Sequence, residues 1–247
     1  MYNSNLSIIR GYILQVNKFK EKDAICTLLT KDGLITYKVN SGLDALNKNH
    51  QACMVYNLVE IDVKNINNSS NYTCNGVKTI QDNSSLYQDI TKNLAISVLI
   101  EASLKTIQDN DEVPYQYFQN CLEAIKNGFD YLTTIYIYLC KLSMNVGIPI
   151  NYDGCVNCSK KKNLISFSYN EGGFICENCA KELQIKPLSI EYMKVIRYGY
   201  IVNSNQIEHA VLPKLSLIKA INELSVYYED SIGIKLNSLK MLLDYLK

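Results

Sequence analysis

The sequence of 247 residues contains no tryptophan, two histidines and only two arginines among its 25 basic residues. It has no run of about 18 apolar residues, the length that a membrane-spanning helix needs. Its first ten residues also lack the cationic and apolar segments of a secretory signal. We therefore expect a cytoplasmic protein that does not bind a membrane. The scarcity of arginine removes most of the bidentate guanidinium contacts that phosphate and base recognition favour.

The sequence also lacks a recognisable set of catalytic side chains. His50 and His209 each lie apart from any serine, cysteine or carboxylate pattern that would support acid–base or nucleophilic chemistry. Gly172-Gly173 is not part of the G-x-x-x-x-G-K-[ST] pattern of a phosphate-binding loop. We predict that the protein is not an enzyme and that both histidines are ordinary surface or core residues.

Charge is nearly balanced over the whole chain, with a formal net charge of +1 at pH 7. Residues 1–80, however, carry nine basic and six acidic side chains. A mildly positive segment is compatible with a polyanionic partner but does not require one.

Five short segments rich in β-branched, aromatic and other apolar residues predict strands in the first eighty residues. The expected strands are residues 8–16, 24–30, 34–39, 53–63 and 72–80. Lys31-Asp32-Gly33 predicts a hairpin between the second and the third. Five short strands with hairpin connections favour a small barrel, of which the OB-fold is one solution.

From residue 81 onward, apolar residues recur at helical spacing. The expected helices begin near Ser84 or Ser85, after Pro114, at Phe129, after Ser189, after Pro213 and at Leu236. We therefore predict an α+β protein with two domains. Residues 1–80 form an OB-fold barrel, and residues 81–247 form a helical domain that contains an insert at about 150–186.

Nine cysteines cannot all pair within one chain, and their number fits a reducing compartment better than a disulfide framework. Five of them lie singly, mostly among apolar residues. We interpret these five as small core hydrophobes rather than reactive thiols: Cys26, Cys53, Cys74, Cys121 and Cys140.

The other four cysteines form two C-x2-C pairs, Cys155 with Cys158 and Cys176 with Cys179, separated by 17 residues. Two residues between ligands let one turn point both sulfurs at one tetrahedral zinc ion. Residues 164–169 are strand-like, and the following glycine pair can turn the chain back, so the second pair can return to the first. Four thiolates leave no coordination position open for water, which predicts one structural Zn²⁺ and no catalytic metal.

Two alternatives to zinc stay open at this point, a redox C-x-x-C site and an iron–sulfur cluster, although the spacing favours both less. Between the cysteine pairs lies the run Lys160-Lys161-Lys162. It could touch phosphate, but a solvated loop tip is the favoured interpretation.

The surroundings of the cysteines resemble a known family. The segment Gly147-Ile-Pro-Ile-Asn-Tyr-Asp-Gly-Cys155-x2-Cys158, then Phe167-Ser168 and Glu171-Gly-Gly-Phe-Ile-Cys176-x2-Cys179, resembles the central signature of the RecO DNA-repair proteins. Phe19-Lys-Glu-Lys-Asp23, followed by Thr27-Leu-Leu-Thr30 and Gly33, resembles the early stretch of that family's OB-fold. The resemblance runs over the whole chain in order.

The resemblance implies a non-enzymatic mediator of recombinational repair, associated with the nucleoid. Such proteins bind single- and double-stranded DNA, anneal complementary strands and pair with RecR. They also bind the acidic C-terminal tail of the single-stranded-DNA-binding protein, which helps RecA load onto coated strands.

An OB barrel with lysines along one face is a suitable platform for a DNA strand, because cations bind phosphates and aromatic rings stack on bases. The expected DNA-binding residues are Arg10, Lys18, Lys20, Lys22, Lys31 and Lys38. The chain departs from the family after the third strand. Residues 38–48 keep only two lysines of a stretch that is usually basic, and they gain Asp44.

Two other classes of function remain. One is a zinc-stapled adaptor module whose barrel binds protein rather than nucleic acid. The other, for which the sequence offers least support, is an enzyme whose site the sequence does not reveal.

Overall fold

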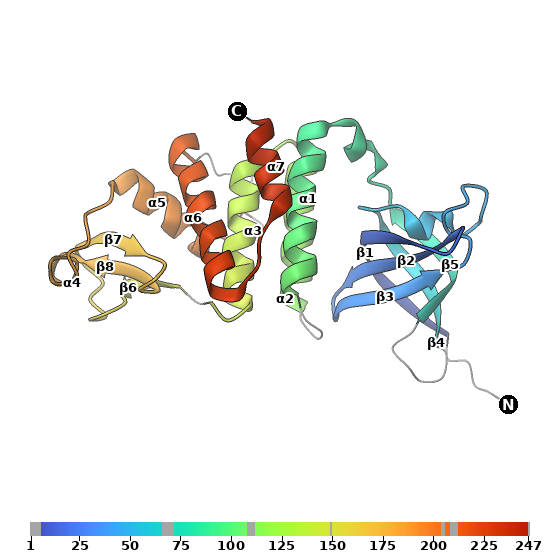
Figure 1. The fold of residues 1–247 in the computed structure, drawn as a ribbon, viewed down its shortest axis with the longest axis horizontal. Helices are drawn as coiled ribbons and strands as arrows, with labels where there is room; N and C mark the ends of the chain where they lie inside the picture. The colour runs from blue at the N-terminus through green and yellow to red at the C-terminus, as the bar shows by residue number, and fades with distance from the viewer. Residues whose placement is uncertain are drawn as a thin grey trace. The chain divides into compact units, whose positions relative to one another are not determined.

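The computed structural model describes residues 6–65, 72–107, 112–148, 150–203, 206–207 and 212–246 (Figure 1). The chain divides into two compact units. Unit 1 comprises Met1–Asn93 and Ile107–Gln116, and unit 2 comprises Leu94–Thr106 and Tyr117–Lys247.

Unit 1 contains a closed barrel of five strands (Figure 1). The strands are β1 (Leu6–Phe19), β2 (Asp23–Thr30), β3 (Gly33–Val39), β4 (Leu58–Asn65) and β5 (Tyr72–Gln81). Their order around the barrel is β1-β2-β3-β5-β4, and β3 and β5 pair in parallel to close it. The predicted OB-fold barrel is confirmed.

The long strand β1 pairs with two neighbouring strands. Its first half, from Leu6 to Tyr12, pairs with β4, and its second half, from Tyr12 to Phe19, pairs with β2. At the changeover Gly11 lies so close to β2 that a Cβ atom there would stand 2.2 Å from the carbonyl oxygen of Leu29. Only glycine allows this approach, so the closure of the barrel depends on it.

The fourth strand begins later than the sequence predicted. Residues 50–53 form a short 3-10 helix, η1 (His50–Cys53), and residues 54–57 connect it to β4. The buried Ala52 of η1 belongs to the barrel core, and its carbonyl oxygen accepts a hydrogen bond of 2.7 Å from the hydroxyl of Tyr37. Tyr56 is left-handed, with φ +77°, which is incompatible with a continuous strand.

The helices lie mostly where helical periodicity predicts them. They are α1 (Ile90–Thr106), α2 (Glu112–Lys126), α3 (Tyr131–Asn145), α5 (Ile190–Ile201), α6 (Lys214–Ile232) and α7 (Asn237–Tyr245). Helix α3 is buried nearly all round, as its apolar sequence predicts. The hydroxyl of Ser189 caps α5 by accepting a hydrogen bond from the backbone N–H of Tyr192, also as predicted.

Two predicted helix starts are wrong. Ser84 and Ser85 begin a separate 3-10 helix, η2 (Ser84–Gln88), and α1 starts only at Ile90. Helix α2 starts two residues before Pro114 rather than after it. Proline is tolerated in the first turn of a helix because the N–H groups there have no intrahelical partner. Among the described helices, none has both the length and the apolar character that crossing a bilayer requires.

Candidate metal centre and nucleic-acid surface

The insert between α3 and α5 folds into a small three-stranded sheet and a short helix, here called the cysteine module (Figure 1). Its elements are β6 (Asn151–Cys155), β7 (Leu164–Ser168), β8 (Gly173–Cys176) and α4 (Glu177–Glu182). The sheet order is β6-β8-β7, with β8 parallel to β6 and antiparallel to β7. The strand expected near 164–169 and the turn before Gly173 are both present, whereas β6, β8 and α4 were not predicted.

Gly173 allows β6 and β8 to lie together. A Cβ atom at this position would stand 2.4 Å from the carbonyl oxygen of Asn151, and the residue has φ +157°. The preceding Gly172 is left-handed, with φ +80°. The two glycines thus form the turn that brings the second cysteine pair back to the first.

The four cysteines of the module meet at one point. Cys155 ends β6, Cys158 lies in the turn that follows, Cys176 ends β8, and Cys179 lies in the first turn of α4. Their four Sγ atoms all lie within 4.8 Å of one another, and those of Cys158 and Cys176 are 3.5 Å apart. In a tetrahedral site with Zn–S bonds of about 2.3 Å, neighbouring sulfurs are about 3.8 Å apart. The cluster therefore has the dimensions of a four-thiolate metal site.

Backbone N–H groups hold the pKa of two of these thiols below its ordinary value. Burial raises the pKa of Cys155, but N–H groups of Cys176, Asn157 and Cys158 outweigh it and bring this pKa down to about 6. The backbone N–H of Cys179 lowers the pKa of Cys176. Both effects follow from hydrogen bonding to the charged form of the thiol.

The other two thiols hold their protons more tightly. Burial and the neighbouring thiols raise the pKa of Cys179 to about 12. The backbone N–H of Lys160 lowers the pKa of Cys158, but burial and the thiols of Cys176 and Cys155 more than offset it. A third and a fourth negative charge are unfavourable beside two others unless a cation compensates them. A bound divalent cation supplies that compensation, so the donor set fits a metal ion that all four sulfurs share.

The apolar core of the cysteine module is small. The cluster around the sulfurs contains, besides the cysteines, the buried residues Ile175 and Ala180, supported by partly buried side chains such as Leu164 and Ile185. Phe167 of β7 and Phe174 of β8 are buried elsewhere on the same sheet. A core of this size contributes little stability, and small domains of this kind usually need a metal or disulfides. The module is therefore built around its sulfur cluster.

The predicted DNA-binding residues do not all lie together. Lys18, Lys20 and Lys22 lie at the hairpin between β1 and β2, and Lys38 lies beside them because it pairs with Ile25 of β2. Lys31 lies in the β2–β3 turn, at the other end of the eight-residue β2. At about 3.3 Å per residue, the two turns are about 25 Å apart.

Arg10 is also separate from the lysines. It lies opposite Glu60 of β4, in the first half of β1 and eight residues before Lys18. The six predicted residues therefore occupy three places on the barrel, of which only the β1–β2 hairpin gathers several cations.

At this hairpin, acidic partners engage two of the four lysines. The Nζ atom of Lys22 lies 2.9 Å from a carboxylate oxygen of Asp44, and that of Lys38 lies 2.9 Å from Asp23. Asp44 is the residue by which the sequence departs from the basic stretch of the resembled family. Within the described chain, no ion pair involves Lys18 or Lys20.

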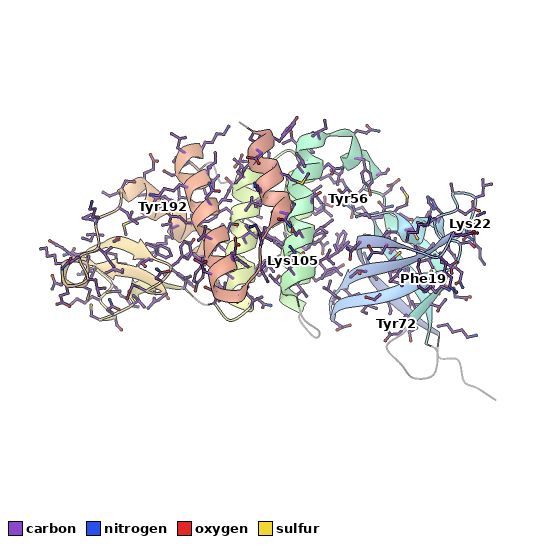
Figure 2. The ribbon with its side chains drawn as sticks, in the orientation of Figure 1. Phe19, Lys22, Tyr56, Tyr72, Lys105 and Tyr192 are labelled. Carbon is purple, nitrogen blue, oxygen red and sulfur yellow. The ribbon has the colours of Figure 1, made fainter. Side chains whose placement is uncertain are left out.

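The hairpin also presents an aromatic ring that was not predicted as a site residue. Phe19 is 38% exposed, and the Nζ atoms of Lys20 and Lys38 lie 5.6 and 5.5 Å from its ring centre. Figure 2 shows Phe19 and Lys22 on the barrel. A sequence signal was present, since Phe19 opens the lysine-rich segment that carries the family resemblance, but only the structure shows its exposure. We name Phe19, Lys18, Lys20, Lys22 and Lys38 the hairpin surface.

The two histidines and the five single cysteines were expected to be ordinary structural residues. The Nδ1 atom of the half-buried His50 lies 2.7 Å from the carbonyl oxygen of Gly42, which fits an ordinary structural histidine. His209 and Pro149 lie outside the described residues. Of the five single cysteines, Cys53 is half-buried and the other four are buried as predicted: Cys26, Cys74, Cys121 and Cys140.

A family model and several similar proteins of known name point to one family. A family model described as "Recombination protein O C terminal" matches residues 87–240, more than half of the chain. A "DNA repair protein RecO" of Lactobacillus acidophilus is 26% identical over 96% of each chain, and one of Lactobacillus helveticus is 25% identical over the same share. Another, of Caldicellulosiruptor bescii, is 27% identical over 86% of each chain.

Proposed function

The chain belongs to the RecO family of DNA-repair proteins, and on that premise we propose that it is a non-enzymatic mediator of recombinational repair. The observation that carries the proposal is the match of the family model together with relatives of the same name along nearly the whole chain. In this role the protein would act on chromosomal DNA in the cytoplasm. It would anneal complementary strands and help RecA load onto single strands.

We propose the hairpin surface as the contact for single- and double-stranded DNA. Ammonium groups attract phosphates and release counterions, and an exposed ring such as Phe19 can stack on a base. Lys18 and Lys20 are the strongest candidates, because the carboxylates of Asp44 and Asp23 already engage Lys22 and Lys38. Lys31 and Arg10 would extend the path of a longer strand around the barrel.

For the metal centre we propose one structural Zn²⁺, held by Cys155, Cys158, Cys176 and Cys179. When bound, it supplies a closed tetrahedral scaffold and no reactive position. The four side chains hold the ends of β6 and β8 and the start of α4 at one point. The module thereby keeps its shape on a small apolar core.

The proposed protein partners are RecR and the C-terminal tail of the single-stranded-DNA-binding protein, with contacts on the helical body. This part rests on family membership. Pull-down of the purified chain with the acidic tail peptide and with RecR tests it, and absence of both complexes would remove the mediator role.

The DNA proposal is tested by a salt series with a labelled oligothymidylate of about 30 nucleotides, long enough for several OB-fold sites. We expect binding to weaken steeply between about 50 and 200 mM salt. Each phosphate contact on a single strand contributes about 0.7 to the slope of log K against log salt. The double variant Lys18→Gln/Lys20→Gln should therefore lower the slope by about 1.4.

A matched control removes two lysines from β4 and β5 of the same barrel, Lys64→Gln/Lys78→Gln, and should leave the slope nearly unchanged. Phe19→Ala should weaken binding by about 1–3 kcal/mol, the contribution of one stacked base, without changing the slope. Absence of binding by the unmodified chain even at low salt would favour the adaptor module, whose barrel binds protein.

A further inference from the structure

We propose that the three consecutive lysines of the cysteine module, Lys160, Lys161 and Lys162, form a second contact for the phosphate backbone of single-stranded nucleic acid. This inference rests on the proposed function and deepens it by adding an anion site outside the barrel. The lysines line a hollow of about 430 Å³, together with Asn163, Cys176, Glu177 and Asn178. We name this hollow the lysine pocket.

The loop that carries the lysines is held at both ends. The carbonyl oxygen of Lys160 accepts a hydrogen bond of 2.8 Å from the backbone N–H of Cys155, within the turn of the first cysteine pair. At the other end, the carbonyl oxygen of Asn163 accepts one of 3.0 Å from the N–H of Glu177. The ammonium groups therefore extend from an anchored loop, so less conformational entropy is lost when an anion binds.

Both flanks of the lysine run are left-handed. Ser159 has φ +60° and Asn163 has φ +55°, neither of which is a glycine. Such residues are uncommon and cluster at functional sites, because the surrounding structure must hold them in place. Here the hydrogen bonds of the cysteine turn and of α4 do so. With both flanking residues held in this conformation, the three positively charged side chains lie beside one hollow.

The charge in the lysine pocket is unbalanced. None of the three ammonium groups makes an ion pair or a hydrogen bond with another described residue. Among the described lining residues Glu177 is the one carboxylate, and it is paired with Lys181 on its own helix at 2.8 Å. Three cations thus share a concave surface without an internal partner, which attracts a multiply charged anion.

A simpler explanation is that the lysines offset the negative charge of four metal-bound thiolates. The contacts do not favour it. Lys160 acts on a cysteine sulfur through its backbone N–H, which is directed at Cys158. Within the described residues, no hydrogen bond joins any of the three ammonium groups to a sulfur. Their charge is available for an external ligand.

The lining of the pocket favours phosphate over an acidic peptide. Among the described residues, the lining consists of lysine and asparagine side chains, one glutamate and one cysteine, with no aliphatic or aromatic residue. Peptides gain most of their affinity from apolar or aromatic anchors in apolar pockets, and none is offered here. Lysine and asparagine are among the residues that contact phosphate in nucleic-acid complexes.

The experiment uses the full chain and the same oligothymidylate. We compare the unmodified protein with Lys160→Gln/Lys161→Gln/Lys162→Gln and with a control that removes three exposed lysines from α5, α6 and α7, Lys194→Gln/Lys214→Gln/Lys240→Gln. Loss of three single-strand phosphate contacts should lower the slope of log K against log salt by about 2. The control should leave the slope nearly unchanged. Metal content and thermal unfolding are measured for each protein to confirm that the module is folded.

A second measurement needs no variant. Acetylation of lysines in the unmodified protein, mapped by mass spectrometry with and without the oligonucleotide, should show protection of residues 160–162 but not of Lys194. Lack of protection together with an unchanged slope would overturn the proposal.

The remaining outcomes separate the two proposals. If the unmodified chain binds no oligonucleotide even at low salt, the proposed DNA function fails, and the lysine pocket fails with it. If it binds and only the hairpin variant changes the slope, the pocket alone is wrong. Loss of zinc in the triple variant with an unchanged slope would assign the lysines to the metal centre. Competition by an acidic decapeptide that the triple variant abolishes, with unchanged DNA binding, would make the pocket a peptide site.

Discussion

The barrel and the cysteine module are both small β-structures that contain several cysteines, but sulfur has a different role in each. In the barrel, Cys26 and Cys74 lie buried within a large apolar cluster that also contains Leu28 and Tyr37. A hydrogen bond with Cys53 and burial raise the pKa of Cys26, and burial raises that of Cys74 to about 11, so both stay protonated thiols. In the module, four sulfurs meet and few apolar side chains surround them.

The difference shows what determines the role of a cysteine. The Sγ atoms of Cys26 and Cys53 lie only 3.7 Å apart, yet they lie at a large apolar cluster, and among the described residues only the four module cysteines form a group of three or more possible metal ligands. The apolar cluster around the sulfurs of the module is smaller, and backbone N–H groups are directed at three of these sulfurs. Proximity of sulfurs alone is therefore insufficient evidence for a metal site. The number of sulfurs, the hydrogen bonds to them and the size of the surrounding core decide together.

The largest expected effect comes from breaking the metal centre. Cys155→Ser should release the ion, of which metal analysis of the unmodified chain should find about one per molecule. The module should then lose its ordered structure, since structural zinc contributes free energy on the order of 10 kcal/mol in small peptides. Hydrogen exchange should become fast over residues 150–186 and stay slow in the strands of the barrel.

The matched control for this variant is Cys26→Ser, which should keep the metal. Slow exchange over residues 150–186 in metal-free protein would show that the small core suffices on its own. Stoichiometric iron with visible absorbance, in place of zinc, would correct the identity of the ion.

The next largest effect is expected from a substitution that disrupts the barrel and leaves the cysteine module intact. In Gly11→Ala the new methyl group would collide with the backbone of β2 at Leu29, which cannot move without opening the strand pairing. We expect a loss of about 3 kcal/mol in the free energy of unfolding of the barrel, at the upper end of overpacking effects. Denaturant unfolding measures this loss, and the metal content should not change.

Gly76→Ala in the same barrel is the control, because its methyl group would meet the movable carboxylate end of Asp62 rather than backbone. Equal losses for the two alanine variants would show that close strand approach at Gly11 is not what closes the barrel.

A smaller effect should distinguish barrel thiols from metal ligands. Cys26 is fully buried, so Cys26→Ala removes one sulfur from a packed core and should lower the free energy of unfolding by about 1–2 kcal/mol. Cys53→Ala should cost less, because Cys53 is only half-buried. Thermal or denaturant unfolding measures both. A loss of bound metal in either variant would contradict the separation of the two sulfur groups.

The smallest expected effect concerns the helices of unit 2, where hydrogen bonds to one side chain join α1 to the start of α7. The carboxylate of Glu101 in α1 accepts hydrogen bonds from the backbone N–H groups of Asn237 and Ser238, at 3.0 and 2.7 Å, at the start of α7. It also pairs with Lys105 (labelled in Figure 2) at 2.7 Å. Glu101→Gln should lower the free energy of unfolding by about 1 kcal/mol, because the site is partly exposed to solvent.

The same variant should change the pH dependence of stability. Burial raises the pKa of Glu101, but hydrogen bonds from Lys105 and Ser238 outweigh it, and the pKa lies below its ordinary value of 4.5. This stabilisation is therefore fully present above pH 4.5 and is lost as pH falls through the lower folded-state pKa. As the pH falls below 4.5, the free energy of unfolding should decrease less for Glu101→Gln than for the unmodified chain. Denaturant unfolding at a series of pH values measures this difference. The exposed Glu229→Gln is the control, and identical pH profiles for all three proteins would contradict the assignment.

Local patterns in the sequence predicted much of the fold. Strand alternation located β2, β3 and β5 within a residue or two, and the apolar helix α3 was recognised as buried. The start of β4 was wrong, because the left-handed Tyr56 and the packing of η1 on the barrel core depend on residues far along the chain. The start of α1 was wrong because neither serine caps it: Ser84 and Ser85 lie inside η2, whose N-cap is Asn83, and α1 begins at Ile90.

The candidate sites likewise contain some features that the sequence predicts and others that only the folded structure shows. The four cysteines were found from spacing alone, since two residues between ligands fix local geometry wherever the turn is placed. The sequence could not show which of the basic residues lie together on the barrel. Only the strand register shows that Arg10 and Lys31 lie apart from the β1–β2 hairpin. The exposure of Phe19 and the ion pairs of Lys22 and Lys38 likewise depend on neighbours from other segments.

By itself, the sequence determined the chemistry that short segments carry: alternation, helical period, the cysteine pairs and the motifs of a repair family. Only the tertiary structure decided which charges are paired, which ring is exposed and which lysines share a hollow, as at Lys160–Lys162. The physical reason is the separation along the chain over which each kind of interaction acts. Ligand spacing and periodicity act over a few residues, whereas ion pairing, burial and close approach are set by chain segments that meet only in the folded protein.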